Sequence, residues 1–204
     1  MKIVFCDIPM KKDADKQKYK VAGNKALEYD GEVIFPVNVV LAKSMKKGER
    51  VKVVLLTKRD IEGNSPINYA KFQEELDEIN GKIGANIEYV ELNTEFEETR
   101  DVHEKLLRDR VDTLEEDAEI IGDITYGPKP LPIIMFATMN FAEKFFGANI
   151  KNIVYGKVDF VDGKAVNPVI YDMTPLYYLN NLTNTMEHKS SEDAVKALDI
   201  LLDL

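Results

Sequence analysis

Cysteine, histidine and tryptophan are scarce in this sequence of 204 residues, which has one Cys, two His and no Trp. The single Cys6 excludes a disulfide within the chain and any zinc site built from several cysteines. His103 lies in a charged helical segment and His188 in a polar linker, and we expect both side chains to be exposed. We therefore predict no metal site and no histidine-based catalytic triad.

Several phosphate-binding and catalytic motifs are also missing. The sequence has neither of the glycine-rich patterns G-x-x-x-x-G-K-[ST] and G-x-G-x-x-G, and it has no G-x-S-x-G. These absences argue against the phosphate loops and the nucleophile elbow that such motifs build. We expect no cofactor.

Long apolar runs are absent as well. No run reaches the roughly 18 residues of a membrane-spanning helix. The apolar stretch near the N-terminus is shorter than the core of a signal peptide, which has roughly 7–15 residues. We expect a cytoplasmic protein with no membrane contact.

The charge is acidic overall but uneven along the chain. The formal net charge is −9, whereas residues 1–25 hold seven Lys against three Asp, a local net of +4. A general binder of duplex nucleic acid is usually basic, so that role is disfavoured. A local basic segment can attract one anionic ligand, or it can be a solvated lysine-rich loop.

Strand and helix patterns alternate along most of the sequence. Short apolar runs indicate strands at 2–8, 50–57, 85–92, 118–125 and 149–160. The segments between them indicate helices at 32–48, 64–84, 95–114 and 131–148. This alternation predicts an α/β fold, a Rossmann-like, doubly wound and mostly parallel sheet.

The end of the chain departs from this alternation. Residues 149–160 and 165–173 read as two strands joined near Asp162-Gly163, a hairpin signal. Helices are expected at 174–184 and 190–204. We predict one domain over 1–204, with a core at about 1–160 and a C-terminal hairpin and helices at about 161–204.

Polar and cationic residues follow the predicted strands at their carboxyl ends, the edge where open α/β sheets bind ligands. They suit a ligand with phosphates and hydroxyls. The candidate ligand-binding residues are Asp7, Ile8, Pro9, Met10, Lys11, Lys12, Thr57, Asn64, Asp123, Thr125, Tyr126, Gly127, Pro128, Lys129, Leu131, Tyr155 and Gly156.

The stretch IIGDITYGPKPLP at 120–132 can be interpreted in two ways. Gly127 lets a backbone approach a ligand closely, and a following helix N-terminus favours an anion. However, the three prolines in this stretch remove three N–H donors. The alternative is a rigid strand-to-helix turn whose prolines fix the entry into the helix.

Residues 120–179 contain a series of short motifs. They are Asp123, Thr125, Tyr126 and Gly127 at a strand end, Leu131 and Pro132 at a helix entry, Ile153 to Gly156 in a strand, and Asp172 and Thr174 in a later element. In this order the motifs resemble the CARF domains of type III CRISPR systems. The resemblance implies a homodimer that binds one cyclic oligoadenylate, with cyclic tetra-adenylate favoured, in antiviral signalling.

The resemblance also implies a possible reaction, cleavage of the ring by the ligand's own 2′-hydroxyl. The protein would align that hydroxyl with the phosphate and stabilise the developing charge. The first candidate for charge stabilisation is Lys129, followed by Lys11 or Lys12. Thr125 and Tyr126 would position the ribose.

Two positions differ from the family pattern. Tyr126 stands where many members have His, and Lys129-Pro130 stand where Arg-Ser is common. Tyr126 could stack on an adenine. Lys129 supplies a positive charge without the bidentate geometry of Arg.

Three functions stay open at this point. Neither histidine has an Arg at the spacing of the R-x4-6-H motif of HEPN ribonucleases, so we expect a stand-alone sensor. It could be a ring nuclease, or a non-catalytic sensor or sponge that acts through an effector partner. The third possibility is an unrelated nucleotide-binding α/β protein.

Overall fold

The computed structural model describes residues 1–11, 15–59, 63–95, 97–162, 164–185 and 190–202. The chain forms two compact units, Met1–Thr174 and Pro175–Leu204. The second unit contains most of α5 (Thr174–Thr185) and all of α6 (Ser191–Leu202). Ser190 caps α6, since its hydroxyl accepts a hydrogen bond from the Asp193 N–H at 3.2 Å.

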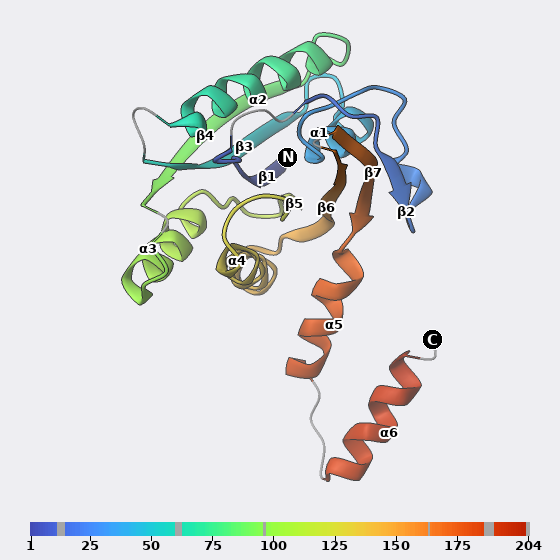
Figure 1. Cartoon of the computed structure of the whole chain (residues 1–204). Helices are drawn as coiled ribbons and strands as arrows, with labels where there is room; N and C mark the ends of the chain where they lie inside the picture. The colour runs from blue at the N-terminus through green and yellow to red at the C-terminus, as the bar shows by residue number, and fades with distance from the viewer. Residues whose placement is uncertain (12–14, 60–62, 96, 163, 186–189, 203–204) are drawn as a thin grey trace. The chain divides into compact units, whose positions relative to one another are not determined.

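The first unit is built on a seven-stranded sheet in the order β2-β7-β6-β5-β1-β3-β4 (Figure 1). Neighbouring strands are parallel except for the antiparallel pair β6–β7. The prediction of a mostly parallel α/β sheet is therefore confirmed. The strands are β1 (Lys2–Asp7), β2 (Lys20–Ala22), β3 (Arg50–Lys58), β4 (Asn86–Thr94), β5 (Glu119–Asp123), β6 (Asn149–Val161) and β7 (Lys164–Asp172).

Helices cover both faces of this sheet, as a doubly wound fold requires (Figure 1). One face packs on α1 (Val37–Ser44) and α2 (Asn64–Asn80), and the other on α3 (Arg100–Val111) and α4 (Pro130–Phe146). A short 3-10 helix, η1 (Lys25–Leu27), follows β2. Because both faces are covered, every residue of β1 is buried, which explains the unbroken apolar run near the N-terminus.

The helix predicted at 32–48 begins later, at Val37. The buried carboxylate of Glu75 on α2 accepts hydrogen bonds from the N–H groups of Ile34 at 2.7 Å and Phe35 at 3.2 Å. It also accepts one from the Asn38 side chain at 2.8 Å. These bonds satisfy the backbone without a helical turn, so this part of the prediction is wrong.

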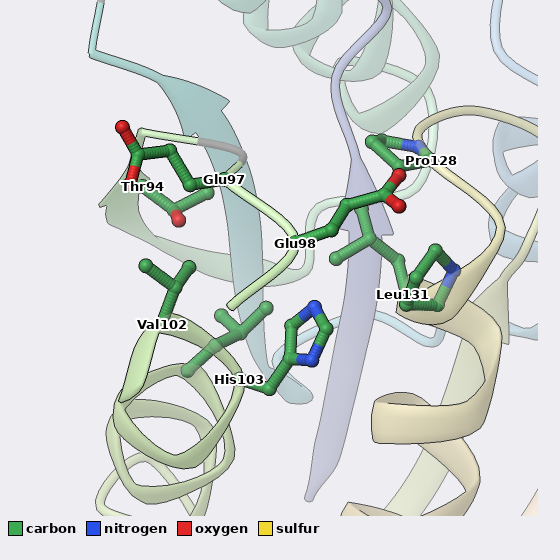
Figure 2. Close-up of a pocket in the computed structure, with 9 residues that line it drawn as sticks. Thr94, Glu97, Glu98, Val102, His103, Pro128 and Leu131 are labelled. Carbon is green, nitrogen blue, oxygen red and sulfur yellow. The ribbon is translucent and has the colours of Figure 1, made fainter. Parts of the chain in front are cut away.

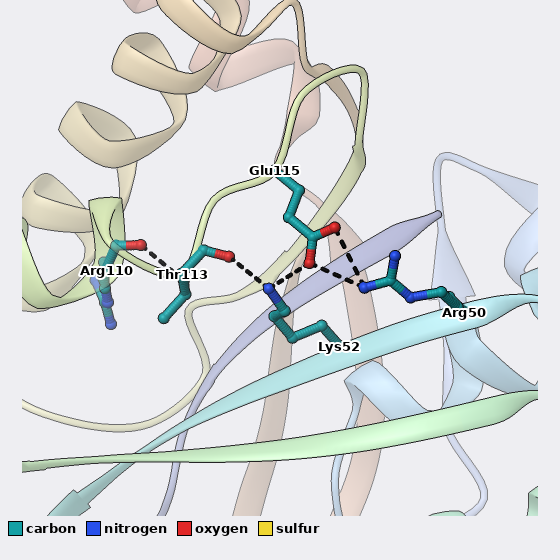
Figure 3. A network of polar contacts seen from close by, with 5 residues as sticks. All are labelled: Arg50, Lys52, Arg110, Thr113 and Glu115. Atoms are coloured by element: carbon teal, nitrogen blue, oxygen red, sulfur yellow. Dashed lines mark hydrogen bonds and ion pairs between the residues drawn. The ribbon is translucent and has the colours of Figure 1, made fainter.

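A polar network at the amino edge of the sheet ties the α3–β5 connection to β3 (Figure 3). The ammonium of Lys52 lies 2.5 Å from the Glu115 carboxylate and donates to the Thr113 carbonyl at 3.1 Å. Arg50 also donates to Glu115, at 3.1 Å. The Thr113 hydroxyl donates to the Arg110 carbonyl at 2.7 Å, so the network fixes the last turn of α3.

Candidate functional site

The candidate site lies where β1 and β5 end side by side. The parallel strands follow the order β6-β5-β1-β3-β4. The next strands in the sequence after β1, β3 and β4, therefore lie on one side of β1, and β5 and β6 lie on its other side. This is the topological switch point, where open α/β sheets bind their ligands. Cys6 pairs with Asp123 across the two strands, which brings the loop after β1 and the turn after β5 together.

A buried ion pair lies under the turn after β5. Asp7 and Arg110 are each 1% exposed, and the guanidinium Nη2 lies 2.5 Å from Asp7 Oδ1. Burial raises the pKa of Asp7, and the charge of Arg110 opposes that shift. Asp7 Oδ2 and Arg110 Nη1 have no hydrogen-bond partner among the residues that the structure describes.

Gly127 covers the unpartnered oxygen of Asp7. Its φ of +94° is in the region that favours glycine. A Cβ at this position would lie 2.6 Å from Leu131 Cδ1 and 3.7 Å from Asp7 Oδ2. The exposed backbone of Gly127 therefore separates solvent from the buried ion pair, and a side chain here would displace the turn.

Asp123 fastens the same turn from the other side. Its Oδ2 accepts the Val37 N–H at 3.0 Å at the start of α1, and its Oδ1 accepts the Thr125 N–H at 2.8 Å. The Thr125 hydroxyl in turn accepts the Gly156 N–H of β6 at 2.8 Å. These bonds hold the turn against α1 and β6.

Burial raises the pKa of Asp123 from 3.8 to about 6. A carboxyl with a raised pKa in the folded chain stabilises the fold below its unfolded pKa and loses that contribution as the pH rises through the folded value. We expect the free energy of unfolding of the wild type, relative to that of Asp123→Asn, to fall by up to about 3 kcal/mol from about pH 4 to about pH 7. Urea unfolding across this range measures it, and a difference that grows with pH would contradict the expectation.

Tyr126 points inward in this structure. Its hydroxyl donates to the Ile34 carbonyl at 3.1 Å, and its ring packs edge-on against Phe35 with centroids 6.3 Å apart. Burial raises the pKa of the Tyr126 hydroxyl. The residue thus fastens the segment before α1, and its suggested roles in stacking on an adenine and positioning a ribose stay predictions.

The loop after β1 is held by α2. The Asn68 side chain donates to the carbonyls of Pro9 at 2.7 Å and Lys11 at 3.0 Å, and the Asn64 side chain donates to the Met10 carbonyl at 3.3 Å. The side chains of Met10 and Lys11 stay exposed. Sequence reasoning missed Asn68, because only the fold shows that its position in α2 faces this loop.

Lys11 and Lys129 bring positive charge to the two sides of the switch point. Both side chains are exposed, and neither ammonium has a hydrogen bond or ion pair with another residue in the described part of the chain. Other lysines of the N-terminal segment that the structure describes have partners elsewhere, such as Lys16, which pairs with Glu78 at 3.4 Å. Lys2 is buried at the amino edge and pairs with Glu49 at 2.5 Å and Glu119 at 3.2 Å.

Thr57 lies apart from this group. It is buried on β3, and its hydroxyl is within 2.7 Å of both Glu91 Oε1 and Asn93 Oδ1 on β4. Its hydroxyl therefore connects two strands rather than facing the switch point.

The structure separates the predicted site residues by exposure. Met10, Lys11, Gly127, Lys129 and Tyr155 are exposed; Asn64, Thr125, Tyr126 and Pro128 are partly buried; Asp7, Ile8, Pro9, Thr57, Asp123, Leu131 and Gly156 are buried. Lys12 lies outside the described residues. The exposed set can touch a ligand directly, and much of the buried set holds the two loops in place.

Figure 2 shows a small pocket beside the turn. It is lined by Thr94, Glu97, Glu98, Val102, His103, Leu106, Pro128, Pro130 and Leu131, and its cavity measures about 10 Å³, room for about one water. His103 is half-buried here rather than exposed, which corrects the expectation for this residue. A neighbouring pocket, which shares Thr94, Val102 and Leu106, measures about 120 Å³.

Neither of these two pockets holds a nucleotide by itself, since small-molecule sites usually measure roughly 300–1,000 Å³. Among the described residues, no three His, Cys, Asp or Glu side chains are grouped so that they could hold a metal ion. In the same part of the chain, no helix is both long enough and apolar enough to cross a membrane.

Comparison with known proteins assigns no family. No protein-family model matches the sequence, and the search of curated proteins finds no significant match. The function is therefore inferred from the geometry of the switch point and from the sequence.

Proposed function

We propose that this protein binds a cyclic oligoadenylate, with cyclic tetra-adenylate favoured, between the carboxyl edges of two copies of the chain, in type III CRISPR antiviral signalling. One observation carries the proposal. At the switch point of a Rossmann-like sheet, a preformed turn with an exposed glycine and a free lysine faces a loop with a second free lysine. The resemblance of the motifs in this turn to those of CARF domains supports the choice of ligand.

Anion binding at this turn would depend on side chains more than on backbone. The N-terminus of α4 favours negative charge through the helix dipole. However, Pro128, Pro130 and Pro132 have no N–H, and the Leu131 N–H already donates to the Pro128 carbonyl at 3.1 Å. With those amides missing or in use, the exposed ammonium of Lys129 is a donor that this segment offers to a phosphate.

A second copy of the chain would complete the site. The pockets beside the turn measure about 10 and 120 Å³, so one chain offers an open edge rather than an enclosed cavity. Two copies related by a two-fold axis would present the same turn to both halves of a ring that itself has two-fold symmetry. This arrangement would enclose the ligand without any further domain.

Cleavage of the ring is the second candidate function, because Lys11 and Lys129 leave two ammonium groups free at the edge. A ribose 2′-oxygen would attack the adjacent phosphorus and lose its proton, while the bond from phosphorus to the 5′-oxygen breaks. The leaving oxygen would take up a proton, and a linear product with a 2′,3′-cyclic phosphate would result. The lysines would stabilise the charge that develops on the phosphoryl oxygens.

Calorimetry with cyclic tri-, tetra- and hexa-adenylate in EDTA, followed by chromatography of the nucleotide, tests the proposal. We expect tight binding of cyclic tetra-adenylate with one ring per two chains. Linear products would establish a ring nuclease, and an intact ring would establish a sensor or sponge. Binding of AMP or a dinucleotide in preference to every ring would contradict the proposal and favour an unrelated nucleotide-binding protein.

A further inference from the structure

Two tyrosines form a pair on the β6–β7 hairpin. Tyr155 and Tyr171 are opposite each other in the antiparallel register. Their ring centroids lie 6.4 Å apart, and their planes are 27° from parallel. Each residue is 37% exposed, so both rings keep open surface. Exposed aromatic rings of this kind are surfaces on which nucleic-acid bases stack.

A β-bulge places the two rings on one face of the hairpin. The register shifts at Val158, which is opposed by two residues of β7, Asn167 and Pro168. Asn167 has a φ of +49°, a conformation that Asn tolerates better than most residues. Pro168 has no N–H to donate, which suits a bulge. If β7 continued the register of Asp159 and Val166 without a bulge, Tyr171 would lie opposite Val154, on the other face of the hairpin from Tyr155.

The pair adjoins the candidate site. Gly156, the next residue after Tyr155, donates its N–H to the Thr125 hydroxyl at 2.8 Å. A Cβ on Gly156 would lie 2.2 Å from Pro36 Cγ, so this position faces the N-terminal end of α1. Because side chains alternate along a strand, Tyr155 faces the other side of the sheet. That is the side on which the turn after β5 enters α4.

Lys157 adds a positive charge beside the rings. It lies two residues beyond Tyr155, on the same face of β6. Its ammonium pairs with Asp159 at 3.0 Å. Aromatic surface and a cation side by side match a nucleotide, which has a flat base and a charged phosphate.

We propose that Tyr155 and Tyr171 stack on an adenine base of the bound ligand and that Lys157 contacts an adjacent phosphate. This inference rests on the proposed function and adds Tyr171 and Lys157 to its site. Asn167 is a positioning residue, because it holds the bulge that sets the register of the two rings.

Binding of cyclic tetra-adenylate to the full chain, measured by calorimetry, tests the inference. We expect Tyr171→Ala to weaken binding by about tenfold or more, as loss of base stacking does, and Tyr171→Phe to bind like the wild type. Phe160→Ala is the matched control, because Phe160 is an exposed aromatic of the same strand, 72% exposed, on the opposite face of β6. This control should leave affinity unchanged.

The role of the bulge has its own pair of variants. Asn167→Gly keeps access to a positive φ and should bind like the wild type, whereas Asn167→Val disfavours that conformation and should weaken binding. If the wild type binds the ring and Tyr171→Ala binds equally well, the stacking inference is wrong and the proposed function stands. If the wild type binds none of the three rings, the proposed function fails and the inference fails with it.

Discussion

Replacing Arg110 with methionine is expected to lower the free energy of unfolding by about 3–5 kcal/mol, since it leaves a buried charge without its partner. Arg110 and Asp7 are each 1% exposed, and their ion pair measures 2.5 Å. Methionine fills similar volume but cannot neutralise the Asp7 carboxylate. Chemical denaturation of the wild type and the variant measures the difference.

Two controls separate this effect from a general loss of an arginine. Arg108→Met changes an exposed arginine of the same helix and should alter stability by less than about 0.5 kcal/mol. The double variant Asp7→Leu/Arg110→Met removes both charges and should recover most of the loss, because an apolar pair often replaces a buried ion pair without penalty. A loss below about 1 kcal/mol for Arg110→Met would show that the pair does not carry the stability inferred for it.

Replacing Lys129 with alanine is expected to weaken binding of cyclic tetra-adenylate by about tenfold or more, because a charge-assisted hydrogen bond to a phosphate is removed. The stability of the fold should not change, since this side chain is exposed and has no ion pair within the described residues. Calorimetry measures affinity, and thermal unfolding of the same samples measures stability. If the ring is cleaved, the rate should fall as well.

Lys144→Ala is the matched control for Lys129→Ala. Lys144 is an exposed lysine on the same helix, about 22 Å further along its axis at the usual helical rise, near the amino edge of the sheet. It should leave affinity unchanged. Equal loss in both variants would point to a general effect of net charge, and no loss in either would remove Lys129 from the site.

The mostly parallel sheet and the hairpin could be predicted because they depend on local patterns. Alternating apolar runs and helical periods are enough to indicate a parallel sheet with helices on both faces. Once the sheet is parallel, the ends of its strands must share one edge, so Lys11 and Lys129 could be assigned to that edge without coordinates. The Asp162-Gly163 turn likewise indicated the hairpin.

Contacts between distant segments could not be predicted in the same way. Glu75 lies about forty residues from the backbone it holds at Ile34, and Arg110 lies 103 residues from Asp7. Nothing in the local sequence distinguishes these charged residues from the solvated ones beside them. The position of Tyr171 depends on a one-residue bulge, and a shift of one residue in register moves every following side chain to the other face.

The most direct test is to locate the ligand on the fold. Hydrogen–deuterium exchange of the full chain, with and without cyclic tetra-adenylate, measures which amides become protected. We expect added protection at residues 8–11 and 124–131, at the carboxyl edge, and none at residues 45–50 and 112–118, at the amino edge. Unchanged exchange at 124–131 in the presence of saturating ligand, or protection confined to the amino edge, would contradict the proposed site.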